Sequence, residues 1–244
     1  MFNLLVVEDN LHYSKNLINF ILKNNYNVKL VGIATNGKEA LKYLTSKMYN
    51  IDIILLDLKM PYYTGIELVS ELKKQILYRY QNSIIVVSGE PSLISLIKNE
   101  PFIYSYVDKI NGLQKISNEL NNLIKLKLKE NHTILLKNKI LAELKYLNYN
   151  ENFVGTQYLL EAIMLLAENN NLDSINLKRD VFPIIAFRHK KSPHNIKCNI
   201  NNATVIMNCD CQKDIIMKYF NFSNTRTEVK PKQVIEAILK RITA

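Results

Sequence analysis

Ile53 to Pro61 read IILLDLKMP, an apolar run that ends in a single carboxylate, Asp57. Four consecutive apolar residues indicate a strand that is buried on both faces, as is typical of a parallel sheet. The chain therefore carries one Asp at the point where this strand leaves the core. On this run alone, two interpretations stay open: Asp57 is a turn or helix-cap residue, or it does chemistry.

Composition limits the classes of protein that the chain can be. Its 244 residues suffice for two domains, and a hydrophobic content of 48% supplies a packed core for each. No apolar run approaches the roughly 20 residues that span a bilayer, and the first residues do not resemble a signal peptide. We therefore expect a soluble, cytoplasmic protein. The three cysteines, two of them in Cys209-Asp210-Cys211, do not fit a disulfide framework or a usual zinc spacing.

The net charge of +10 is unevenly distributed along the chain. Residues 1–124 contain 13 Lys and Arg against 11 Asp and Glu, whereas residues 125–244 contain 19 against 11. A basic half-chain without a membrane helix most often binds a polyanion, and a merely solvated surface is the alternative interpretation.

The first half of the sequence alternates between apolar strand patterns and helical patterns. Because parallel strands need crossover helices, five of each predict a five-stranded parallel sheet with helices on both faces. The expected strands cover residues 3–7, 28–33, 53–56, 83–87 and 103–107, and the expected helices cover 11–24, 37–48, 65–76, 91–98 and 112–128.

Polar residues follow four of these strands directly. In open α/β sheets, ligands bind beyond the carboxyl ends of the strands, so we expect these side chains to face one another. Crowded carboxylates share a proton or hold a hard cation such as Mg²⁺, and a carboxylate beside that cation can accept a phosphoryl group. The residues are Glu8 and Asp9 after the first strand, Asp57 after the third, Ser88 after the fourth and Lys109 after the fifth.

Residues 1–124 resemble the receiver domain of two-component response regulators. The resemblance rests on Glu8-Asp9, Asp57 with Met60-Pro61 and Gly65 after it, Ser88-Gly89 and Lys109. It implies a flavodoxin-like fold with Asp57 as the phosphoacceptor and Mg²⁺ or Mn²⁺ as the cofactor. It further implies that Asp9, Asp57 and the backbone carbonyl of Lys59 are metal ligands, that Glu8 binds the metal through water, and that Ser88 and Lys109 sense the phosphate. Tyr106 takes the place of the family's switch aromatic, with plain packing as the alternative.

Two residues depart from the family pattern. Ile110 follows Lys109 where the family usually has proline, and this difference affects the direction in which the Lys109 side chain points. Lys59 places a cation two residues after Asp57, where it either pairs with a bound phosphate or points to solvent.

The second half shows helical patterns only. Residues 125–136 form a polar, basic connection without Pro or Gly, which favours a helical or semi-rigid linker. We expect an all-α domain over residues 137–244, with helices at 137–147 and from Gly155 onward.

A helix, a tight turn and a second helix are predicted between Val181 and Asn208. Pro183 can begin a short helix that runs to Lys190, and Ser192-Pro193 is a good N-cap with proline at the first helical position. On the second helix, one buried stripe is predicted at Ile196, Ile200, Ala203 and Met207. A polar outer face makes this a helix-turn-helix, whose second helix enters the major groove; a helical hairpin with a solvated face is the alternative. The candidate DNA-contacting residues are Arg188, Lys190, Lys191, Ser192, His194, Asn195, Lys197, Cys198, Asn201 and Asn202.

Residues 137–242 resemble the DNA-binding domain of the stage-zero sporulation regulators of spore-forming Firmicutes. The resemblance rests on GTQYLLEAI at 155–163, VFPIIA at 181–186, Ser192-Pro193 and the closing helix 232–242. It implies that 192–207 is the recognition helix and that Asn195, Lys197, Cys198 and Asn201 stand where bases are read. The family has arginines at several of these positions, so a divergent paralogue with a different, A·T-richer target is the preferred interpretation.

Together these features predict a response regulator transcription factor that is not an enzyme beyond its own phosphorylation and dephosphorylation. A histidine kinase or phosphotransfer protein would phosphorylate Asp57, the protein would dimerise, and two basic domains would bind duplex DNA. Two alternatives remain open: a phosphorylation-gated protein-binding or relay module without DNA binding, and a metal-dependent hydrolase.

Overall fold

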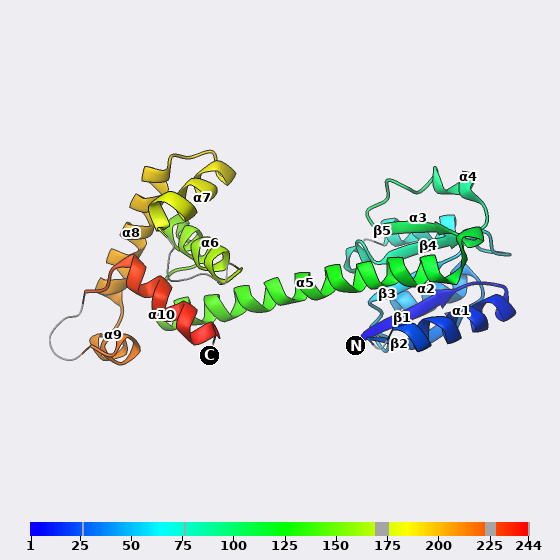
Figure 1. Cartoon of the computed structure of the whole chain (residues 1–244), viewed down its shortest axis with the longest axis horizontal. Coiled ribbons are helices and arrows are strands. Elements are labelled where there is room, and N and C mark those ends of the chain that lie inside the picture. Colours follow the sequence, from blue (N-terminus) through cyan, green and yellow to red (C-terminus); the bar gives the residue numbers. More distant parts are fainter. Residues whose placement is uncertain (26, 76, 169–175, 223–227, 244) are drawn as a thin grey trace. The chain divides into compact units, whose positions relative to one another are not determined.

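The computed structural model describes residues 1–25, 27–75, 77–168, 176–222 and 228–243. The chain divides into two compact units, Met1–Lys129 and Glu130–Ala244 (Figure 1). None of the helices in these ranges is both long and apolar enough to cross a membrane.

The first unit contains a five-stranded, all-parallel sheet with the strand order β2-β1-β3-β4-β5 (Figure 1). This confirms the predicted fold. The strands are β1 (Phe2–Val7), β2 (Val28–Ala34), β3 (Ile53–Leu56), β4 (Ile84–Ser88) and β5 (Ile103–Asp108). The helices between them are α1 (Leu11–Asn24), α2 (Gly37–Thr45), α3 (Gly65–Lys74), the 3₁₀ turn η1 (Tyr78–Tyr80) and α4 (Pro91–Ile94).

The two faces of the sheet are both buried, because successive side chains of a strand point to opposite faces. In β1, Leu4 and Val6 belong to the core beneath α1 and α5 (Gly112–Tyr146), whereas Leu5 and Val7 belong to the core beneath α2, α3 and α4. All four residues of β3 are buried, as the apolar run at 53–56 predicted.

Helix α5 is longer than expected. The sequence predicted one helix ending near residue 128 and another beginning near 137, but a single helix, α5, spans Gly112 to Tyr146 and is preceded by the 3₁₀ turn η2 (Lys109–Asn111). No Pro or Gly interrupts residues 125–136, so every residue there can keep a helical backbone. The segment is helical throughout.

The part of the second unit that the structure describes is all helical, which confirms the predicted class. Its elements after α5 are α6 (Val154–Glu168), a π-helical turn η3 (Leu177–Val181), α7 (Phe182–Arg188), α8 (Pro193–Asp210), α9 (Lys213–Phe220) and α10 (Pro231–Thr243). Helix α9 was not predicted, and α7 ends two residues before Lys190. The predicted stripe on α8 is buried, with Ile196, Ile200 and Met207 at 0% exposure and Ala203 at 4%.

Candidate functional site

The candidate phosphoryl site lies at the carboxyl edge of the sheet. The backbone N–H of Asp57 donates to the Val7 carbonyl, 2.9 Å away, and the N–H of Glu8 donates to the Ala34 carbonyl, also 2.9 Å away. These ladder bonds fix the chain direction just where β1 and β3 end. Glu8, Asp9 and Asp57 are thereby held on neighbouring strand ends.

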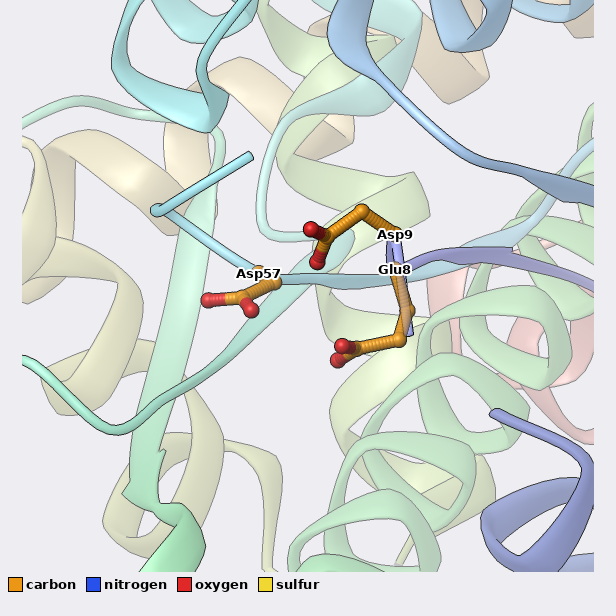
Figure 2. A group of neighbouring side chains, drawn as sticks. All are labelled: Glu8, Asp9 and Asp57. Carbon is orange, nitrogen blue, oxygen red and sulfur yellow. The ribbon is translucent and has the colours of Figure 1, made fainter. Parts of the chain in front are cut away.

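The three carboxylates converge. One oxygen from each of Glu8, Asp9 and Asp57 lies within 4.8 Å of the others, and Figure 2 shows the three side chains gathered around one point. Glu8 and Asp57 are buried, while Asp9 is exposed. Burial raises the pKa of Glu8 above its ordinary value, and the charge of Asp57 raises it further. Oxygen ligands of this kind and spacing suit a hard divalent cation.

Lys109 is aimed at the same point. Its Nζ lies 2.6 Å from Asp57 Oδ2 and 2.8 Å from Glu8 Oε2. Burial alone would lower the pKa of Lys109, but the hydrogen bonds to Asp57 and Glu8 outweigh it and raise the pKa above its ordinary value. The Lys109–Ile110 peptide bond is trans, and the ammonium still reaches both acids.

Three further residues were predicted to act with Asp57. Ser88, at the end of β4, is fully buried, and its Oγ accepts a hydrogen bond from the Glu90 N–H at 3.3 Å. The Lys59 N–H donates to Asp57 Oδ1 at 3.2 Å. The Lys59 side chain, however, forms a 2.7 Å ion pair with Glu90, a partner that the sequence did not suggest. Tyr106 is 59% exposed on β5, so its ring is not part of the core.

Gly65 lets helix α3 begin against the backbone of Asp57. A Cβ at Gly65 would lie 2.3 Å from the Asp57 carbonyl oxygen and 3.0 Å from Leu58 Cα. The Gly65 N–H donates to the Leu58 carbonyl at 3.1 Å, and Thr64 with Glu67 forms a capping box at the helix start. The loop after Asp57 is therefore held at both its ends.

Helices α7 and α8 form the predicted helix-turn-helix. Between them the chain turns at Lys190, whose φ of 52° is left-handed, and Ser192 caps α8 by accepting the Asn195 N–H at 3.1 Å. Gly155 of α6 packs closely on α8, since a Cβ there would lie only 2.1 Å from the Asn199 carbonyl oxygen. Helix α8 is thus fixed to the core of its unit.

The candidate DNA-contacting side chains lie on the outer side of this arrangement. Lys197, Cys198 and Asn201 are half-buried, and the others are exposed: Arg188, Lys190, Lys191, Ser192, His194, Asn195 and Asn202. Arg188 already has a partner within its unit, because its Nη1 lies 2.7 Å from a carboxylate oxygen of Glu161 on α6. The other oxygen of Glu161 lies 2.7 Å from His189 Nε2. Glu161 was missed by sequence reasoning, since nothing in its local pattern marks it as a partner of α7. Cys198 Sγ lies 3.4 Å from His194 Nε2, and all three cysteines are free.

Comparisons with known families agree with this geometry. Residues 4–119 match the response regulator receiver domain, and residues 140–242 match the domain described as sporulation initiation factor Spo0A C terminal. The chain joins a response regulator receiver domain to a Spo0A-type C-terminal domain. Both domains match where the sequence resemblances predicted them.

Individual curated relatives match only part of the chain. A probable transcriptional regulator, ycf29, from Pyropia yezoensis is 37% identical over 73 residues, which are 30% of this chain and 31% of that protein. A protein-glutamate methylesterase/protein-glutamine glutaminase from Desulfotalea psychrophila is 38% identical over 69 residues, 28% of this chain and 18% of that protein. The chain spans less than a third of the length of these curated relatives.

Solved structures of receiver domains are also similar to this chain. One from Clostridium thermocellum is 25% identical with a TM-score of 0.43, covering 52% of this chain and 97% of that one. A LuxR-family DNA-binding response regulator from Staphylococcus aureus is 22% identical with a TM-score of 0.43, covering 50% of this chain and 98% of that one.

Proposed function

We propose that the chain is a transcription factor whose DNA binding is controlled by phosphorylation of Asp57. The observation that carries the proposal is the convergence of Glu8, Asp9, Asp57 and Lys109 at one sheet edge, in a chain whose other domain is of the Spo0A type. Asp57 is a carboxylate with two further acids and one ammonium beside it. In this setting, the neighbouring groups can compensate the negative charge that an incoming phosphoryl group brings.

A divalent cation, Mg²⁺ or Mn²⁺, fits the acidic cluster. Asp9, Asp57 and the carbonyl of Lys59 would hold it directly, and Glu8 would hold it through water. When bound, the cation neutralises the carboxylates and the charge that develops on the phosphoryl oxygens. The donor set is all oxygen, as hard cations require.

Asp57 is the nucleophile in this scheme. A carboxylate oxygen of Asp57 attacks phosphorus, and an O–P bond forms as the bond from phosphorus to the donor's leaving atom breaks. The electron pair of the broken bond leaves with the donor, for which a phosphohistidine of a kinase or phosphotransfer protein is the expected source. Lys109 and the Ser88 hydroxyl then contact the phosphoryl oxygens, and Tyr106 changes its position as the β4–α4 loop follows Ser88.

The Spo0A-type domain supplies the output. Helix α8 would enter the major groove of duplex DNA with Asn195, Lys197, Cys198 and Asn201 toward the bases, while Arg188, Lys190, Lys191, Ser192, His194 and Asn202 would contact phosphates or flanking bases. Residues 125–136 would connect the two domains, 1–124 and 137–244, and phosphorylation would favour a dimer on two half-sites. The cytoplasm is the compartment in which such a protein meets both its donor and DNA.

Selection of bound genomic fragments tests this function. We expect the protein treated with a low-molecular-weight acyl phosphate and Mg²⁺ to recover specific fragments, and Asp57→Ala to recover fewer. Asp52→Ala is the matched control, since Asp52 stands at the opposite end of β3, where it accepts the Asn3 N–H. Equal recovery by the wild type and Asp57→Ala would show that the switch does not operate. Absence of DNA binding in low salt would refute the DNA-binding role and leave the protein-binding module.

A further inference from the structure

Tyr13, on the first turn of α1, is the one aromatic ring that the described residues place against the Lys109 ammonium. Lys109 Nζ lies 4.7 Å from the centroid of the Tyr13 ring, over its face. The same ammonium is bound by Asp57 Oδ2 and Glu8 Oε2. An ammonium has three N–H groups, and here two carboxylates and one ring face surround it.

The Tyr13 ring is held in place by the residues that follow Glu8. The Asn10 N–H donates to Glu8 Oε1 at 3.3 Å, and Asn10 Oδ1 accepts the Tyr13 N–H at 3.0 Å as the N-cap of α1. The ring packs against the core beneath α1 and α5. Two hydrogen bonds through Asn10 therefore connect Glu8, which pairs with Lys109, to Tyr13, whose ring covers the Lys109 ammonium.

The hydroxyl of Tyr13 contributes nothing visible to this arrangement. It is buried and has no hydrogen-bond partner among the described residues. Burying an unpaired hydroxyl is unfavourable, so this position does not gain from a phenol as such. What the position uses is the face of the ring, whose negative quadrupole attracts the cation.

We propose that Tyr13 is a positioning residue for phosphorylation, which acts by holding the Lys109 ammonium over Asp57 through the ring face. This inference rests on the proposed function of Asp57. With the ring face against the ammonium, its charge stays directed at the two carboxylates and at the phosphoryl group that Asp57 receives. Without the ring, the flexible Lys109 side chain can turn toward solvent.

The test compares Tyr13→Leu, which keeps an apolar side chain but removes the ring face, with Tyr13→Phe, which keeps the face and removes only the unpaired hydroxyl. With a low-molecular-weight acyl phosphate and Mg²⁺, we expect Tyr13→Leu to phosphorylate about tenfold more slowly and Tyr13→Phe to retain the rate. Tyr104→Leu is the matched control, because Tyr104 packs on the same core and lies near Glu119.

A double-mutant cycle separates positioning from mere packing. If Tyr13 acts through Lys109, adding Tyr13→Leu to Lys109→Ala should slow the reaction no further. An additional tenfold loss in that background, or equal rates for Tyr13→Phe and Tyr13→Leu, would overturn the inference.

An NMR measurement without a phosphodonor tests the contact between ring and ammonium separately from the proposed function. The Lys109 Cε protons near the ring face should show an upfield NMR shift in the wild type and in Tyr13→Phe, and lose it in Tyr13→Leu. Absence of the shift in the wild type would refute the placement of the ring. If the wild type shows the shift but takes up no phosphoryl group on Asp57, the proposed function fails while the contact between ring and ammonium stands.

Discussion

Lys109 Nζ lies 2.6 Å from Asp57 Oδ2, and the same nitrogen lies 2.8 Å from Glu8 Oε2. The ammonium therefore offsets part of the negative charge of two buried carboxylates that a divalent cation would also bind. A divalent cation held by Asp57 and Glu8 would draw on the same negative charge as Lys109, which makes several substitutions informative.

Removing Lys109 should strengthen cation binding while weakening phosphorylation. In Lys109→Ala, Asp57 and Glu8 lose a competing positive charge, so we expect Mg²⁺ to bind several-fold more tightly in a titration without a phosphodonor. The phosphorylation rate should fall at least a hundredfold, because no ammonium remains to meet the phosphoryl oxygens. Lys115→Ala, which breaks a pair between an exposed lysine and the half-buried Glu119 on α5, is the control. Weaker Mg²⁺ binding by Lys109→Ala would contradict this account.

The exposed pair of Lys59 and Glu90 should affect the rate more than the stability. Their side chains are 72% and 43% exposed, so solvent screens the pair and breaking it should change the free energy of unfolding little. For an anionic phosphodonor, Lys59→Ala should lower the phosphorylation rate a few-fold and Glu90→Gln should raise it, with both effects fading in high salt. The double variant should return near the wild-type rate. A salt-independent effect would point to geometry instead of charge.

Gly65 and Gly89 offer a matched pair for the loop geometry around the site. A Cβ at Gly65 would overlap the Asp57 carbonyl oxygen, whereas nothing lies within 4 Å of a Cβ at Gly89. We expect Gly65→Ala to lower the unfolding free energy of the receiver domain by about 1 to 3 kcal/mol, and Gly89→Ala to change it little. Denaturant unfolding followed by the NMR signals of receiver-domain residues measures both. Equal stabilities would mean that α3 can shift without cost.

Lys197 should make an individual contribution to DNA affinity. It is the lysine on the outer side of α8. Lys197→Ala should cost about 1 to 3 kcal/mol of binding free energy. If Lys197 contacts a phosphate, the number of counterions released on DNA binding should fall by about one. Lys232→Ala on α10 is the control, since that lysine faces Glu236 at 3.6 Å. Identical losses from both variants would indicate a diffuse electrostatic attraction without a defined contact.

Glu161 should restrain DNA binding. Its carboxylate holds both Arg188 and His189, each at 2.7 Å, at the end of α7. Glu161→Gln removes a negative charge beside the proposed DNA surface and frees Arg188, so affinity should rise several-fold and depend more steeply on salt. Arg188→Ala in the same background should cancel the gain. A fall in affinity on Glu161→Gln would show that the ion pair instead holds Arg188 in its binding position.

Local patterns sufficed to predict the fold class and the residues of the acidic site. The run at 53–56 indicated a strand buried on both faces, and parallel strands bring their carboxyl ends to one edge, so Asp57 was expected to lie near Glu8 and Asp9. The α8 stripe was equally determined, because apolar residues at spacings of four, three and four share one helix face.

The sequence by itself thus determined the five strands, most of the helices and the edge of the sheet that carries the acidic cluster. Only the tertiary structure decided the side-chain partners: the Tyr13 ring over Lys109, Glu90 against Lys59, and Glu161 against Arg188. It also showed that α5 is one continuous helix. The physical reason is that periodicity is a property of neighbouring residues, whereas these contacts join long side chains from different elements. Their pairing depends on rotamers and on the distance between packed helices, which no local pattern records.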